Sequence, residues 1–247
     1  MINNLGLVSV TFRKNTPEEI LIAMKDAGLS YIEWGSDVHA PKNDLNSLNE
    51  IVSLQGKYGI KCCSYGTYFR LGSTNIAELT DYISAAKILG TKVLRVWCGN
   101  KNSQEYTAKE KEKLFAECKM AANIAEKSGV ILCMECHINT FTNKKESALE
   151  LMKFVDSKNF RMYWQPNQCY SEEENLQSAR LLSPYTVNLH VFNWTKDKKL
   201  PLADAKDIWQ KYISCFNNDI KLLLEFMPDG KIESLKTETE TLRGIAK

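Results

Sequence analysis

The chain has 247 residues, of which 44% are hydrophobic and 25% charged, and its formal net charge is +2. This composition can bury a sizeable core, and the near balance of acidic and basic residues argues against nucleic acid or a membrane surface as a partner. The N-terminal stretch lacks a signal-peptide pattern, and no apolar run approaches the roughly 18 residues of a spanning helix, so we expect a cytoplasmic protein.

Apolar runs alternate along the chain with segments of helical spacing. In the first unit, an apolar run at residues 5–10 is followed by Thr16 and Pro17, which suit a helix start, and Gly28 ends that helix. The predicted strands cover residues 5–10, 31–34, 60–65, 93–98, 130–137, 160–164, 186–192 and 221–226. The predicted helices begin near residues 17, 45, 76, 107, 145, 171, 208 and 232.

Eight such strand–helix units, each of about 30 residues, indicate a (β/α)8 TIM barrel, a fold of roughly 250 residues. We therefore predict one domain over residues 1–247. A doubly wound α/β sheet is the competing architecture. It usually carries a glycine-rich first turn, and the sequence has neither G-x-G-x-x-G nor a P-loop.

Eight cysteines raise the possibility of disulfides or a zinc site. Cys133 and Cys136 form a C-x-x-C pair, but they lie on a predicted strand, where residues three apart point to opposite faces. That pair cannot bind one ion without breaking the strand. We interpret the cysteines as reduced, mostly buried apolar residues.

Polar residues lie at the ends of the last four predicted strands: Glu135, Gln165, His190 and Glu225. In a barrel these strand ends converge on one pocket. Two carboxylates, an imidazole and an amide suit a divalent cation such as Mn²⁺, Mg²⁺ or Zn²⁺. Two carboxylates beside a bound sugar could also move a proton from one carbon to another. Taken singly, each glutamate could instead form a salt bridge at the rim, and the histidine could be a core residue.

Other side chains could contact a substrate at this pocket. His137 shares a face of the predicted strand with Glu135. Trp97, at the end of the fourth predicted strand, either packs in the core or forms an aromatic wall for a sugar. Lys196 lies in a lysine-rich loop after the seventh strand and could reach an anionic substrate.

The sequence resembles the sugar phosphate isomerase/epimerase family of xylose-isomerase-like TIM barrels over nearly its whole length. The motifs that carry the resemblance are the E-x-H of Glu135 and His137, the strand-seven His190, and the run L-L-L-E-F that contains Glu225. The resemblance implies that Glu135 and Glu225 both bind the metal and act as acid and base, that His190 is a ligand, and that Glu33 has a supporting role.

The chain departs from the family after the sixth strand. Gln165 stands where the family has an aspartate ligand, and Gln168 where it has a substrate-binding histidine. If the family's roles apply at these positions, Gln165 is an uncharged metal ligand and Gln168 is a substrate contact. The loss of one negative charge predicts weaker metal binding and makes metal-free chemistry credible. Lys196 stands near the family's substrate-binding arginine, whose bidentate geometry a lysine does not reproduce.

Three functions remain open from the sequence. The first is an isomerase or epimerase of a small sugar, sugar phosphate or hydroxy-ketone, in which the two glutamates exchange protons. The second is an inosose-type dehydratase on the same barrel, and the third is a non-catalytic carbohydrate-binding barrel with a degenerate metal site. In each case we expect a small-molecule carbohydrate as the partner, no nucleic acid, and a possible homodimer.

Overall fold

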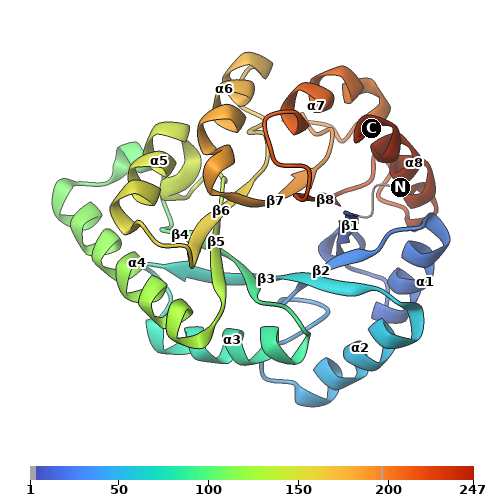
Figure 1. The fold of residues 1–247 in the computed structure, drawn as a ribbon, viewed down its shortest axis with the longest axis horizontal. Coiled ribbons are helices and arrows are strands. Elements are labelled where there is room, and N and C mark those ends of the chain that lie inside the picture. Colours follow the sequence, from blue (N-terminus) through green and yellow to red (C-terminus); the bar gives the residue numbers. More distant parts are fainter. Residues whose placement is uncertain (1–3, 196) are drawn as a thin grey trace.

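Eight parallel strands close into a barrel because β1 pairs with β8 as well as with β2 (Figure 1). The computed structural model describes residues 4–195 and 197–247. The strands are β1 (Leu5–Val8), β2 (Tyr31–Gly35), β3 (Lys61–Leu71), β4 (Val93–Cys98), β5 (Ile131–Glu135), β6 (Phe160–Trp164), β7 (Thr186–Val191) and β8 (Lys221–Leu224). The predicted single-domain (β/α)8 barrel is confirmed, and the open sheet is excluded.

The main helices surround the strands in Figure 1. They are α1 (Pro17–Ala27), α2 (Leu45–Tyr58), α3 (Leu79–Ile88), α4 (Ala108–Ser128), α5 (Lys145–Val155), α6 (Glu172–Leu182), α7 (Lys206–Ile213) and α8 (Leu235–Ile245). Capping boxes start three of them, at Thr16, Thr107 and Ser171. The helices predicted from residues 76 and 232 each begin with a short 3₁₀ turn before α3 and α8. None of the helices in the described part of the chain is long and apolar enough to cross a bilayer.

Strand β3 is the largest departure from the prediction, because it runs to Leu71 rather than residue 65. Its pairing with β4 is interrupted between Gly66 and Arg70. The glycine looks like a strand end in the sequence, yet here it lies inside the strand. The extra residues bring Tyr68 and Arg70 to the end of the barrel where β4 and β5 also end.

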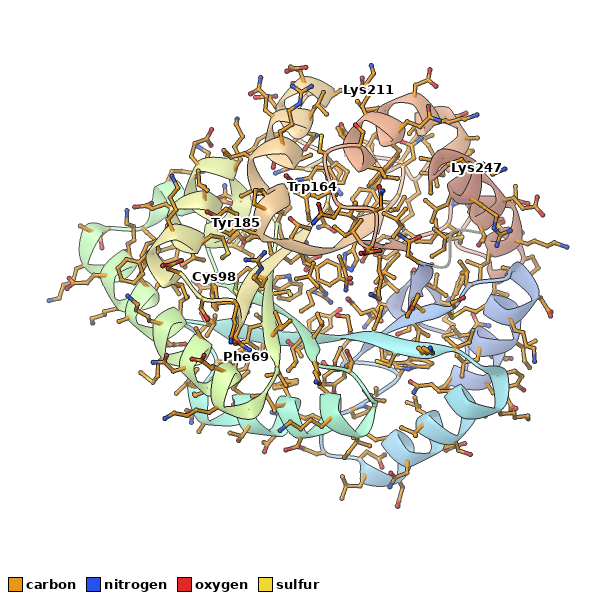
Figure 2. All side chains as sticks on the ribbon, viewed as in Figure 1. Phe69, Cys98, Trp164, Tyr185, Lys211 and Lys247 are labelled. Atoms are coloured by element: carbon orange, nitrogen blue, oxygen red, sulfur yellow. The ribbon has the colours of Figure 1, made fainter. Side chains whose placement is uncertain are left out.

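The core has two parts, whose side chains are drawn in Figure 2. The larger part lies between strands and helices and includes Trp34, Trp164 and Trp209. A smaller cluster fills the barrel interior and includes Cys133, whereas Cys136 packs against the larger cluster. Cys133, on β5, and Cys136, which follows the last residue of that strand, therefore face opposite sides of the barrel wall. The strand predicted to reach residue 137 ends earlier, at Glu135.

Candidate active site

A cleft of about 330 Å³ opens at the carboxyl end of the barrel. Six residues predicted to contact metal or substrate line it: Trp97, Glu135, His137, Gln165, Gln168 and Glu225. The predicted substrate contact Lys196 lies outside the described residues. A larger hollow, of about 840 Å³, lies outside the barrel beside α4 and α5, away from these side chains. The predicted site residues are therefore gathered in the smaller cleft.

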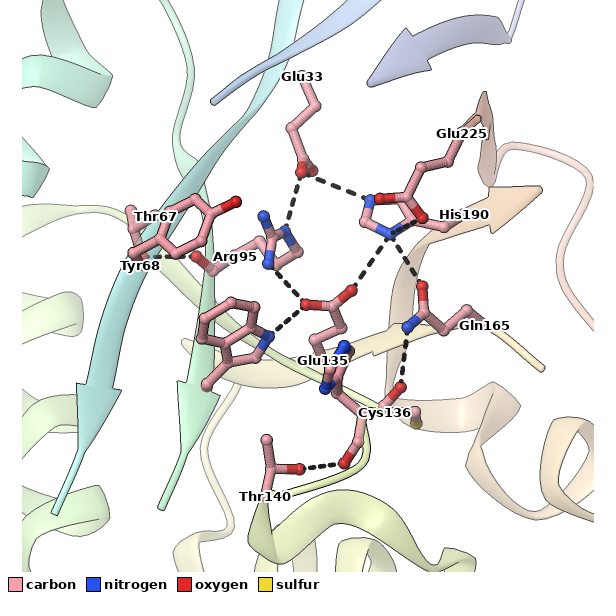
Figure 3. Close-up of polar contacts among 12 residues, drawn as sticks. Glu33, Thr67, Tyr68, Arg95, Glu135, Cys136, Thr140, Gln165, His190 and Glu225 are labelled. Carbon is pink, nitrogen blue, oxygen red and sulfur yellow. Dashed lines mark hydrogen bonds and ion pairs between the residues drawn. The ribbon is translucent and has the colours of Figure 1, made fainter. Parts of the chain in front are cut away.

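His190 lies under this cleft, on β7, with its side chain fully buried. Its Nδ1 atom is 3.1 Å from Gln165 Oε1, 3.4 Å from Glu135 Oε1 and 3.5 Å from Glu225 Oε2. Figure 3 shows the four residues grouped in this way. The structure thus brings together the four predicted metal ligands, although their roles stay predictions.

Arg95, on β4, is a charged residue of this site to which the sequence assigned no role. Its Nε donates to Glu33 Oε1 at 2.9 Å, and its Nη1 donates to Glu135 Oε2 at 2.6 Å. The side chain is only 4% exposed, yet it lines the cleft. A basic residue inside the otherwise apolar run V-L-R-V-W-C was the available indication, because a buried arginine requires an acidic partner.

Gly66, on the neighbouring strand β3, makes room for this ion pair. A Cβ atom there would lie 2.7 Å from Glu33 Oε1 and 2.9 Å from Arg95 Nη2. Gly66 also pairs in register with Arg95. The glycine is therefore required by a close approach of buried charged groups rather than by a turn.

Glu33, on β2, is fully buried and joins Arg95 to His190, whose Nε2 is 3.4 Å from Glu33 Oε1. Burial alone would raise the pKa of Glu33, but the charges of Arg95 and His190 lower it to about 2. Burial likewise lowers the pKa of His190, but Glu225, Glu33 and Glu135 together raise it to about 10. Glu33 is thus a buried ion-pair partner of Arg95, and its supporting role stays a prediction.

The two candidate acid/base glutamates have very different surroundings. Burial raises the pKa of Glu135, but the Arg95 guanidinium and His190 hold it well below its usual range. Trp97 Nε1 also donates to the same Glu135 oxygen that Arg95 contacts. Glu225 has no such donors in the described structure, and its pKa is raised by burial and by the charge of Glu135, against the effect of His190. A carboxylate held ionised thus lies beside one that retains its proton more readily.

Comparison with known proteins agrees with this architecture. The family model described as "Xylose isomerase-like TIM barrel" matches residues 21–214. The chain belongs to this family. The resemblance found in the sequence is therefore confirmed. No curated protein matches the chain.

Solved structures of other proteins superpose over most of the chain. The probable 3-DHS dehydratase AsbF from Bacillus anthracis has a TM-score of 0.83 at 17% identity, covering 97% of this chain and 98% of its own. D-psicose 3-epimerase from Clostridium cellulolyticum H10 has a TM-score of 0.71 at 14% identity, covering 98% of both chains. A barrel from Mycobacterium smegmatis in complex with magnesium has a TM-score of 0.69 at 12% identity, covering 95% of this chain and 90% of its own. At these identities the likeness shows the fold.

The donor atoms of this xylose isomerase-like barrel do not suit the divalent cation that the sequence predicts. Spacings of 3.1–3.5 Å about His190 Nδ1 would match ligands around a small cation. However, Gln165 Nε2 donates to the Cys136 carbonyl, so its Oε1 faces His190 and can only accept a hydrogen. The hydrogen-bond network therefore assigns a hydrogen to Nδ1, which removes the lone pair that a metal would need. Within residues 4–195 and 197–247, no group of three or more His, Cys, Asp and Glu side chains is arranged to hold a metal ion.

Proposed function

We propose that this xylose isomerase-like barrel is an isomerase or epimerase of a small sugar, sugar phosphate or hydroxy-ketone. The observation that carries the proposal is the pair Glu135 and Glu225, which line one cleft and whose pKa values are shifted in opposite directions. Acid/base catalysis needs a group whose pKa approaches the working pH, and the raised pKa of Glu225 meets that need better than that of Glu135.

In the proposed isomerisation, ionised Glu225 removes the proton from the carbon beside the substrate carbonyl and leaves an enediolate. Glu225 then returns this proton to the neighbouring carbon, while the hydroxyl proton of the first carbon passes to the former carbonyl oxygen. In an epimerisation, Glu135, which is held ionised, takes the proton from one face, and protonated Glu225 delivers its proton to the opposite face of the same carbon. Arg95 faces the same cleft, and its fixed charge favours the negative charge that develops on the enediolate oxygens.

The cleft walls support a carbohydrate ligand. Tyr68, Trp97, His137, Phe192 and Trp194 contribute aromatic rings to the lining. Such rings pack against the apolar face of a sugar, while nearby carboxylates and amides bind its hydroxyl groups. His137, Gln168 and Trp97 are the proposed substrate contacts. This arrangement also fits the non-catalytic carbohydrate binder, so turnover must be measured.

Deuterium exchange tests the proposal directly. The protein is incubated in D₂O with D-fructose, D-tagatose or L-ribulose, and incorporation at carbon is followed by mass spectrometry. We expect exchange with at least one sugar in the wild type and a loss of at least 100-fold in Glu225→Gln. Glu238→Gln is the matched control, because Glu238 is also a buried glutamate with a raised pKa, but it lies outside the cleft and accepts from the Leu202 amide. Sugar binding without any exchange would favour the carbohydrate binder.

Dehydration is a second candidate, favoured by the raised pKa of Glu225. A carboxyl group that retains its proton could protonate a leaving hydroxyl after the first carbon–hydrogen bond breaks. The likeness to the probable 3-DHS dehydratase AsbF agrees with this reaction class. Incubation with an inosose distinguishes the two, because a dehydratase product is lighter by one water and an isomerase product has unchanged mass.

A further inference from the structure

We propose that the Arg95 guanidinium, and not a bound divalent cation, supplies the positive charge of this site, so that the barrel works without a metal ion. Catalysis without a metal rests on the proposed function, whereas the absence of metal binding does not depend on it. Three features of the described residues carry it: the orientation of Gln165, the position of Arg95, and the charge balance of the cluster.

The first feature is the direction in which Gln165 presents its amide. Its nitrogen is 3.1 Å from the Cys136 carbonyl oxygen, an atom that can only accept. Its oxygen therefore faces His190 Nδ1, again at 3.1 Å. Gln165 is only 8% exposed, and its hydrogen bond with His190 is buried. To bind a metal, the amide oxygen would have to release the imidazole N–H, and the ring would have to lose that hydrogen.

The second feature is the place that Arg95 occupies. Its guanidinium lies between Glu33 and Glu135 and donates to both (Figure 3). Glu135 Oε2 already accepts from Arg95 and from Trp97, so only Oε1 of this carboxylate faces His190. A cation bound between Glu135 and Glu225 would therefore share Glu135 with a guanidinium that cannot lose its charge.

The third feature is the balance of charge. Three buried carboxylates, on Glu33, Glu135 and Glu225, surround Arg95 and His190. Arg95 donates to Glu33 and Glu135, so only the Glu225 carboxylate lacks a guanidinium partner. An aspartate at position 165 would add a second such carboxylate and favour a divalent cation, whereas Gln165 does not. The neutral amide and the buried arginine thus both weaken the electrostatic attraction of the cluster for a metal ion.

In this arrangement Arg95 is a positioning residue for Glu135 and a source of fixed positive potential at the cleft wall. Its two hydrogen bonds keep the Glu135 carboxylate oriented and ionised. The aromatic face of Trp97 lies nearby, with the guanidinium carbon 5.5 Å from the ring centroid, which limits the movement of the side chain. A chelator cannot remove this charge, in contrast to a bound metal.

Binding of Mn²⁺ alone, measured by titration calorimetry and thermal shift, tests the inference without a substrate. The wild-type protein, purified without chelator, should contain no stoichiometric metal and should show no saturable Mn²⁺ binding below about 1 mM. Gln165→Asp should bind Mn²⁺ at least ten-fold more tightly, and so should Arg95→Ala. A merely structural role for Arg95 would not produce this gain. Gln165→Asn is the matched control and should behave as the wild type.

Activity gives an independent readout. Proton exchange by the wild type should survive EDTA unchanged, and Arg95→Ala should lose at least 100-fold and regain part of it with Arg95→Lys or with added guanidinium ion. If Arg95→Ala does not fold, Gln165→Asp still decides the question. Micromolar, stoichiometric Mn²⁺ in the wild type, lost in Glu225→Gln, would overturn the inference. Absence of exchange with every sugar, together with absence of Mn²⁺ binding, would overturn the proposed function but leave this inference standing.

Discussion

Replacement of Glu33 by glutamine tests the buried charge cluster most directly. The substitution keeps the size of the side chain but removes the negative charge that faces Arg95 Nε at 2.9 Å and His190 Nε2 at 3.4 Å. Both partners are buried in the folded protein, although Arg95 also borders the cleft. Breaking a buried ion pair by removing one partner costs about 3–5 kcal/mol.

The pKa of Glu33 gives a similar magnitude. In the folded protein it is lowered from 4.5 to about 2, and such a shift corresponds to about 3 kcal/mol of stability. Because the folded-state pKa is the lower one, this contribution is complete above pH 4.5 and is lost as the pH falls from about 4.5 toward 2. The difference between wild type and Glu33→Gln should therefore be about 3 kcal/mol at pH 7 and should shrink with acidification.

Urea unfolding followed by circular dichroism at pH 7, 5 and 3.5 measures this difference. Glu18→Gln is the control, since Glu18 pairs with Lys57 on the surface and its loss should change stability within experimental error. A cost for Glu33→Gln below about 1 kcal/mol at pH 7 would refute the assignment of a strong buried network. A cost that stays constant down to pH 3.5 would refute its electrostatic origin.

Three further outcomes follow from the same geometry. Gly66→Ala should lower the free energy of unfolding by about 1–3 kcal/mol, because the new methyl group meets the ion pair between β2 and β4. Gly56→Ala, where no heavy atom of the described residues lies within 4 Å of the added carbon, should instead be neutral or stabilising in denaturant unfolding. Trp97→Phe keeps an aromatic wall but removes a donor to Glu135, so proton exchange should fall about 10-fold with an unchanged thermal midpoint. The acidic limb of the pH–rate profile should lie above pH 4.5, because Glu225 can accept a proton only above its raised pKa. An acidic limb at or below pH 4.5 would contradict the role of Glu225 as the base.

The sequence predicted the barrel well because each element follows from local rules. Parallel strands buried on both sides are short apolar runs, and the helices between them begin at residues such as Thr16 and Ser171, which cap them in the structure. The convergence of Glu135, His190 and Glu225 followed from the fold alone, since strand ends meet at one end of a barrel. The predicted strand at β3 was too short, because Gly66 looks like a turn residue until its neighbours are known.

Arg95 could not be placed from the sequence in the same way. Its partners Glu33 and Glu135 lie 62 and 40 residues away along the chain, on other strands of the barrel. Which carboxylates it meets depends on strand register, through the pairings of Gly66 with Arg95 and of Arg95 with Cys133. The isolated basic residue in an apolar strand indicates that a buried partner exists, but only the closed barrel identifies it.

The effect of Gln165 on metal binding depends on the presence of Arg95. Considered alone, Gln165 weakens a metal site by removing one carboxylate from it. In the structure its amide hydrogen-bonds both the Cys136 carbonyl and the His190 ring, while Arg95 neutralises the carboxylate of Glu135. An amide at this position and a guanidinium on β4 together satisfy the buried polar groups that a cation would otherwise bind. An aspartate at position 165 should therefore add a buried negative charge without a partner, and a cation could bind there to neutralise it. For this reason Gln165→Asp is the most informative single substitution in this barrel.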